Sequence, residues 1–285
     1  MKIKTTHVAV CALVVLVLFG ISYTLAKLPS YHQSVRTLQA SGLIKKGPAY
    51  RLSEAKELQL TSLYVPLNHT ITEAEIAEIA KLQDLSRFSA KSFECENMPL
   101  LFAALAKLPK LDDLAISSKE VNDELLLQLP KQQLKRLSLY GCKVTGTALD
   151  SFYNIEDIDL SGSLIDDESC KAIAKLKKLK YIDLYHTKVS DQGLAEFREN
   201  DSIQSFRACM CLDEENRFFS HITDTGLTHL TSIPNLKSIN LHGYDIQGRE
   251  IEKLSALSGL RVLKLRNCNL DDQACLLYTS PSPRD

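Results

Sequence analysis

The stretch LKYIDLYHTKVSDQGLAEF, residues 179–197, contains the pattern that decides the fold. Its first part, LKYIDL, spaces apolar residues as L-x-x-L-x-L, which buries one face of a short strand. Ser190 then offers a hydroxyl that can cap a helix, and Asp191 places negative charge where a helix begins. Leu194 and Phe197 face inward from that helix. The stretch therefore predicts a strand, a turn and a helix.

The strand phrase recurs along most of the chain. The copies are AKELQL from Ala55, LSRFSA from Leu85, LDDLAI from Leu111, LKRLSL from Leu134, IEDIDL from Ile155, LKYIDL from Leu179, IQSFRA from Ile203, LKSINL from Leu236 and LRVLKL from Leu260. They start 21 to 33 residues apart, and about 24 is typical. TEAE, residues 72–75, supplies a helix capping box. No unit can bury its apolar face alone, so neighbouring units are expected to stack.

These units resemble the leucine-rich repeat family, in its cysteine-containing subtype, whose units read L-x-x-L-x-L-x-x-C/T-x-I-T-D-x-G-L. The resemblance covers residues 51–274 and implies an α/β solenoid of about nine repeats. It implies a curved stack with parallel strands on the concave face and helices on the convex face. The small-residue position of the unit is occupied by Cys142, Ser163, Thr187, Cys211 and Cys268.

Three units depart from the family pattern. VNDELLLQL lacks the glycine, VTGTALDSF lacks the aspartate, and IQGREIEKL lacks both at their usual places. We expect these departures to weaken the local register and to leave the fold unchanged.

Residues 1–26 are interpreted as a targeting segment. A short basic lead precedes residues 8–26, an uncharged apolar run about long enough to cross a bilayer. Because this run exceeds the apolar region of most cleaved signals, we interpret it as a membrane anchor; a signal peptide ending near Ala26 is the alternative. Residues 27–50 are expected to be a linker and N-terminal cap. The repeat domain is then extracytoplasmic, either anchored or secreted. This arrangement is similar to membrane-tethered leucine-rich repeat proteins of planctomycete-type bacteria.

The final residues, CLLYTSPSPRD at 275–285, do not continue the repeat. After Ala274 the template requires apolar residues at helical spacing, but two prolines and no apolar stripe follow. The string resembles a translated sequencing-library adapter. We interpret residues 275–285 as an assembly artefact and expect the natural protein to continue past Ala274.

Composition and motifs argue against several function classes. The chain has 34 basic and 35 acidic residues, so its charge does not indicate a nucleic-acid partner. It contains no P-loop, dinucleotide-binding, zinc-protease or hydrolase-nucleophile motif. We therefore predict no enzyme activity, no catalytic residue, no cofactor and no small-molecule substrate. Acidic pairs such as Asp166–Asp167 stand where helices begin, which favours capping over metal binding.

The strand phrase also indicates which residues can meet a partner. The leucine-type residues face the core, so the residues between and just after them line the exposed side of the strands. The candidate ligand-binding residues are Arg136, Tyr140, Asp157, Asp159, Tyr181, Asp183, Tyr185, Arg207, Asn240, His242, Lys264 and Arg266. An acidic, tyrosine-flanked centre grades into a basic C-terminal end, and tyrosine and arginine are frequent interface anchors. Cys209 is expected on the same side.

A second candidate contact is the insertion MCLDEENRFFSH, residues 210–221, which lengthens one unit. Packing of Phe218 and Phe219 back onto the stack is the alternative.

Two functions are compatible with these observations. The leading hypothesis is a non-catalytic module, anchored or exported, that binds a protein or surface ligand through the concave face. The alternative is a targeting arm of a larger enzyme, of kinase or ubiquitin-ligase type, whose catalytic part lies beyond the sequence.

Overall fold

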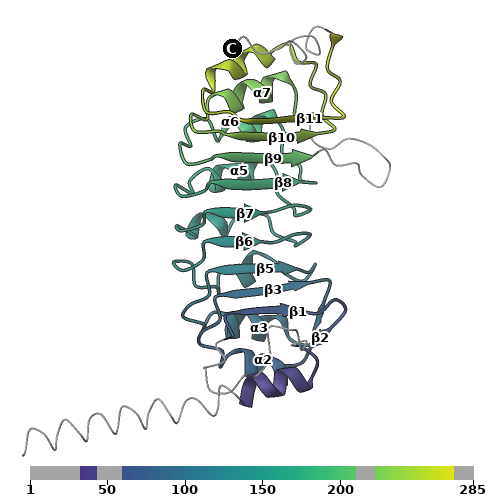
Figure 1. Cartoon of the computed structure of the whole chain (residues 1–285), viewed down its shortest axis with the longest axis vertical. Helices are drawn as coiled ribbons and strands as arrows, with labels where there is room; N and C mark the ends of the chain where they lie inside the picture. Colours follow the sequence, from purple (N-terminus) through teal and green to yellow (C-terminus); the bar gives the residue numbers. More distant parts are fainter. Residues whose placement is uncertain (1–32, 44–59, 210–221, 273–285) are drawn as a thin grey trace, which may run out of the picture.

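The computed structural model describes residues 33–43, 60–209 and 222–272. Its strands form a nine-stranded sheet in the order β1-β3-β5-β6-β7-β8-β9-β10-β11, and neighbouring strands are parallel. Figure 1 shows these strands one above another in chain order, with β1 toward one end and β11 toward the other. The prediction of stacked strand, turn and helix units is confirmed.

Each unit contributes one short strand and one short helix or helical turn. The sheet strands are β1 (Ser62–Val65), β3 (Arg87–Lys91), β5 (Asp113–Ser117), β6 (Arg136–Ser138), β7 (Asp157–Asp159), β8 (Tyr181–Tyr185), β9 (Ser205–Cys209), β10 (Ser238–His242) and β11 (Val262–Arg266). The helices are α2 (Glu73–Ile79), α3 (Met98–Leu105), α4 (Asp123–Leu126), α5 (Asp167–Ile173), α6 (Asp191–Ala195) and α7 (Asp224–Thr231), with 3₁₀ turns η2 (Leu149–Ser151) and η3 (Ile251–Ala256). Strands β2 (Thr70–Ile71) and β4 (Glu94–Cys95) pair separately.

The sheet register aligns equivalent positions of every unit. Leu114, Leu137, Ile158, Ile182 and Phe206 are register partners in successive strands, and each is at most 2% exposed. One apolar core therefore runs through the stack, and each unit completes the core of its neighbours. Burial of this apolar area is the main source of stability.

A helix at residues 33–40 lies against the first unit beside α2 (Figure 1). Val35, Leu38 and Leu43 are buried in the common core. Ser41 and Ser34 hydrogen-bond the side chains of Glu75 and Glu78 in α2. These residues fall inside the range that the sequence predicts as a linker and cap. The described part of the chain contains no helix long and apolar enough to span a membrane, and residues 8–26 lie outside it.

The first unit starts five residues later than the sequence pattern indicated. In the structure, Leu63 pairs with Phe88 and Val65 pairs with Ala90, so the first strand phrase is LTSLYV from Leu60. The predicted phrase AKELQL from Ala55 lies outside the described residues apart from Leu60, where the strand phrase of the structure begins. Both strings fit the apolar spacing, and only the pairing of β1 with β3 decides between them.

The helix caps follow the sequence closely. Thr72 and Glu75 form the predicted capping box of α2, since each side chain binds the other residue's backbone N–H. Asp166 caps α5 in the same way, with Ser169 as its partner. The capping interpretation of the Asp166–Asp167 pair is confirmed for Asp166.

The two units without the usual aspartate form 3₁₀ turns instead of α-helices. The residues before η2 and η3 make no side-chain capping bond, whereas Asn122 caps α4 in the unit that lacks only the glycine. Without that side chain, backbone N–H groups just before these turns are bound from the preceding unit instead: Ala148 donates to Asp123 Oδ1 and Gly248 donates to Asp224 Oδ1.

The aspartate that follows each cap also joins neighbouring units. Asp167 Oδ1 accepts hydrogen bonds from the backbone N–H of Ser190, at 2.7 Å, and of Gly193, at 2.9 Å, both in the next unit. Asp191 binds Thr223 of its next unit in the same manner, through the backbone N–H at 2.9 Å and the hydroxyl at 2.7 Å. We name this contact the inter-unit clasp. It satisfies donors at one helix start with a carboxylate from the preceding one.

The inter-unit clasp explains the glycine of the repeat. A Cβ atom added to Gly193 would lie 2.5 Å from Asp167 Oδ1 and 3.0 Å from both Cys170 Sγ and Val189 Cγ1. The same addition at Gly226 would collide with Asp191. Glycine is therefore required here for close approach between units, and not for an unusual backbone angle.

We expect Gly193→Ala to lower the free energy of unfolding by about 1–3 kcal/mol, because an overpacked contact outweighs alanine's helix preference of about 1 kcal/mol. Gly259→Ala is the matched control, since its nearest atom would be Leu236 O at 3.9 Å. The control should stay within about 0.5 kcal/mol of the parent protein. Urea unfolding of the two variants measures this difference, and equal stabilities would show that the clasp tolerates a methyl group.

Candidate functional site

The exposed side of the nine-stranded sheet is named here the strand face. Parallel, in-register pairing arranges its side chains in columns that run across the strands, with adjacent members about 4.8 Å apart. The central column contains Ser138, Asp159, Asp183, Arg207, Asn240 and Lys264. Residues that are about 24 apart in the sequence thereby become neighbours.

The twelve residues predicted from the strand phrase all occupy strand-face positions of β6 to β11, with Tyr140 just after β6. Exposed members are Arg136, Tyr140, Tyr181, Arg207, Lys264 and Arg266, and half-buried members are Asp157, Asp159, Asp183, Tyr185, Asn240 and His242. Tyr140 and Tyr181 are 52% and 49% exposed, which is high for large rings. The surface therefore presents aromatic side chains around a recessed acidic centre.

Ion pairs hold part of the acidic centre in place. Asp113 in β5 accepts from Arg87 Nε at 2.5 Å and from Arg136 Nη2 at 2.8 Å, so one carboxylate bridges two arginines. Asp183 Oδ2 lies 3.1 Å from Arg207 Nη1. These pairs offset the repulsion between carboxylates stacked on adjacent strands.

Two carboxylates of the centre are less well compensated. Burial raises the pKa of Asp157, and the charges of Asp159, Asp113 and Asp183 raise it further, against the lowering effect of Arg136. Asp157 makes no side-chain hydrogen bond within the described residues. Burial also raises the pKa of Asp183, against the effect of Arg207. The charged forms are therefore held at an energetic cost that a cationic ligand group would relieve.

The C-terminal part of the strand face has a different character. The guanidinium of Arg207 lies over the Tyr185 ring, 5.7 Å from its centroid. Asn240 Oδ1 is buried and accepts no hydrogen bond from the described residues. Lys264 and Arg266 on β11 are exposed. An orphaned acceptor beside basic groups gives this end hydrogen-bonding capacity that the fold itself does not use.

Cys209 corrects one expectation. The sequence predicts that Cys209 is exposed on the strand face. It lies on that face, but it is only 5% exposed. Its Sγ atom is 3.3 Å from His242 Nδ1, and Asn267 Nδ2 lies 2.8 Å from His242 Nε2. Burial raises the pKa of the Cys209 thiol, so the thiol is protonated and a poor nucleophile at neutral pH. Strand alternation alone places Cys209 outside, but contacts such as that with His242 accompany its burial.

Three further strand-face residues were missed by the sequence interpretation. The phrases at Leu85 and Leu111 indicate Arg87 and Asp113, but the candidate set began only with the next unit. Tyr64, which is 58% exposed and accepts from Arg87 Nη1 at 3.1 Å, was hidden by the misplaced first phrase. The polar and aromatic face therefore extends as far as β1.

The small-residue position behaves as a structural site where it is described. Cys142 is 1% exposed and lies 3.5 Å from the carbonyl oxygen of Ile116, and Thr187 donates to Leu184 O at 2.8 Å. Cys268 is only partly buried, and Cys211 and the insertion at 210–221 lie outside the described residues. Within the described ranges, no three His, Cys, Asp or Glu side chains come together as a set of metal ligands.

Two solved structures share this architecture. Internalin C2 of Listeria monocytogenes matches with a TM-score of 0.54 and 23% identity over 72% of this chain and 80% of that chain. The leucine-rich repeat ectodomain of the plant membrane receptor kinase GASSHO1/SCHENGEN3 of Arabidopsis thaliana matches with a TM-score of 0.50 and 15% identity. That match covers 74% of this chain and 24% of the ectodomain chain. The chain has the leucine-rich repeat fold.

No protein-family model matches the chain, and no curated protein matches it. The likeness to the two structures therefore establishes the architecture and identifies no ligand.

We expect Asp157→Asn to raise the free energy of unfolding at pH 7 by about 0.5 kcal/mol, because it removes a charge whose pKa burial raises. The folded-state pKa lies above the unfolded value, so the aspartate destabilises only where it is ionised. The gain should therefore disappear as pH falls below about 4. Thermal unfolding at pH 7 and pH 3.5 tests this, with the exposed Asp150→Asn as control. A pH-independent gain would contradict the electrostatic cause.

Proposed function

We propose that this protein is a non-catalytic binding module that recognises a protein ligand through its strand face. The observation that carries the proposal is the half-buried Asp157, which has no hydrogen-bond partner in the described residues and whose register partner on β8 is the exposed Tyr181. A large exposed ring beside a desolvated carboxyl group is typical of an interface hot spot. A cationic side chain on the ligand would pair with this carboxylate while the Tyr181 ring excludes water.

The same face supports a ligand longer than one residue. The acidic centre spans β5 to β8, and the basic residues Arg207, Lys264 and Arg266 follow on β9 and β11. A ligand with a positive segment and then a negative segment would match this order. The plant ectodomain with the shared fold was solved in complex with CASPARIAN STRIP INTEGRITY FACTOR 2, which supports binding as the class of function and identifies no ligand here.

We further propose that the repeat domain lies outside the cytoplasm, held by residues 8–26. The support is the uncharged apolar run and the basic lead before it. Anchoring would confine the module to a membrane surface and raise its effective concentration toward partners there.

Photo-crosslinking at single sites tests the binding surface. We expect a benzophenone amino acid at position 140 or 181 to yield the same discrete adduct in the source cells. Asp157→Lys should reduce adduct formation at least about tenfold, since truncated or reversed hot spots commonly cost more than 1.4 kcal/mol. The control is the same probe at Tyr153, which is 63% exposed and lies outside the strand face. Adducts from position 153 alone would place the partner elsewhere and refute the strand-face proposal.

A reporter fusion tests the location. With alkaline phosphatase fused after residue 272 and the chain expressed in a bacterium, we expect enzyme activity, because that reporter folds only where its disulfides form. Deletion of residues 8–26 should abolish the activity while the fusion protein still accumulates. Activity that persists after the deletion would exclude this segment as the export signal.

A further inference from the structure

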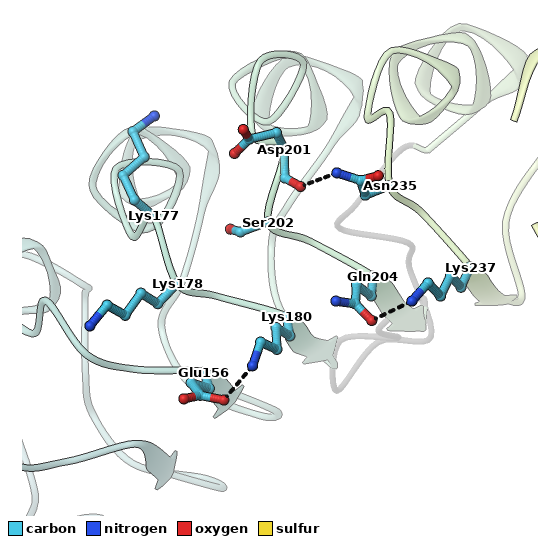
Figure 2. Close-up of a pocket in the computed structure, with 9 residues that line it drawn as sticks. All are labelled: Glu156, Lys177, Lys178, Lys180, Asp201, Ser202, Gln204, Asn235 and Lys237. Carbon is cyan, nitrogen blue, oxygen red and sulfur yellow. Dashed lines mark hydrogen bonds and ion pairs between the residues drawn. The ribbon is translucent and has the colours of Figure 1, made fainter. Parts of the chain in front are cut away.

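A polar hollow lies away from the strand face, at the edge of the sheet where the strands begin. It has a volume of about 480 Å³ and is lined by Glu156, Lys177, Lys178, Lys180, Asp201, Ser202, Gln204, Asn235 and Lys237. Figure 2 shows these side chains arriving from three successive units, just before or at the starts of β8, β9 and β10, with Glu156 from the unit before. We name this feature the strand-start hollow.

Its charge is unlike that of the strand-face centre. Four lysines and two carboxylates line the strand-start hollow, an excess of two positive charges in a chain whose net charge is −1. Lys180 Nζ donates to Glu156 Oε2 at 2.6 Å. Glu156 is therefore paired with Lys180 and with none of the other three lysines of the hollow. The hydrogen bond from Lys180 holds the pKa of Glu156 below its usual range, and the charges of Lys135 and Lys178 act in the same direction.

Three lysines of the hollow have no carboxylate partner within the described residues. Lys178 Nζ donates to the amide oxygen of Asn154 at 2.6 Å, and Lys237 Nζ donates to Gln204 Oε1 at 3.0 Å. Lys177 has no polar partner there, and Figure 2 shows its ammonium group extended away from the chain. Neutral amides orient these cations without neutralising them, so their charge is available to a ligand.

Amide groups add a second kind of recognition. Gln204 uses Oε1 for Lys237, and its Nε2 donates to no described residue. Asn235 donates through Nδ2 to the backbone oxygen of Asp201 at 2.7 Å, and its Oδ1 accepts from no described residue. One open donor and one open acceptor on adjacent units match the alternating N–H and C=O groups of an extended peptide.

We propose that the strand-start hollow binds an extended acidic peptide segment, whose carboxylates meet Lys177, Lys178 and Lys237 while its backbone meets Gln204 and Asn235. A uniformly anionic surface fits less well, because Glu156 and Asp201 interrupt the positive charge. Separated carboxylates on a peptide can avoid these two groups. The site is independent of the strand-face proposal, since it uses another edge of the same units.

The test uses the full chain in a neutral detergent and a fluorescein-labelled peptide of alternating Glu and Ser. Fluorescence anisotropy should show saturable binding that weakens as salt rises, because screening acts on exposed charges. Lys178→Glu/Lys237→Glu should weaken binding at least about tenfold, since two charge-assisted contacts become repulsive. A peptide of alternating Gln and Ser should bind at least about tenfold more weakly than the acidic one.

The matched control variant is Lys119→Glu/Lys143→Glu. Both lysines are exposed, follow strands instead of preceding them, and form no ion pair in the described residues. This variant changes the net charge equally and should bind the acidic peptide within about twofold of the parent chain.

Three outcomes would overturn the proposal. These are no saturable binding of the acidic peptide, an equal loss in the control variant, and binding to phosphatidylserine vesicles without binding to the peptide. The last outcome would assign the hollow to an anionic membrane instead. Circular dichroism of both variants confirms that the comparison is made between folded proteins.

Discussion

The structure depends on a contact that no unit can make by itself: the carboxylate at one helix start binds backbone N–H groups at the next. Asp167 and Asp191 each place their oxygens on the cap of the following unit, and glycine leaves the room for that approach. Apolar burial holds the units together, but burial is non-directional. The clasp adds direction, since its hydrogen bonds form only when the units are in register. Where the aspartate is missing, before η2, Ser169 donates instead to the backbone oxygen of Thr145.

Register then determines the surface chemistry. In a parallel sheet, equivalent residues of neighbouring units lie side by side, so Asp159 and Asp183 become adjacent although they are distant in the chain. Carboxylates stacked in this way repel each other unless cations or donors separate them. Arginines separate some of them, and Asp157 and Asp183 still have raised pKa values. These buried charges lower the stability of the folded chain, and they are the groups with which the proposed cationic ligand would pair.

The strand face and the strand-start hollow differ in a way that follows from their positions. The carboxylates of the strand face project from inner strands that are paired on both sides, so Asp157, Asp159 and Asp183 are half-buried. Lysines of the hollow precede the strands and reach solvent on long stems, which keeps their charges hydrated. The first surface suits a few strong, buried contacts, and the second suits several weaker and salt-sensitive ones.

The sequence by itself determined the unit and its stacking, because the L-x-x-L-x-L spacing and the Ser/Thr-Asp-x-Gly cap are local signals with local causes. It also placed eleven of the twelve strand-face residues on their strands and Tyr140 just after β6, since alternation follows from strand geometry. Only the tertiary structure decided which of two overlapping phrases begins the sheet, because Ala55 and Leu60 start equally good patterns and pairing with β3 selects the second. Only the structure showed that Cys209 is covered and that Asp157 lacks a hydrogen-bond partner among the described residues. These properties depend on side chains of neighbouring units, and the sequence pattern of one unit does not determine how those side chains pack against it.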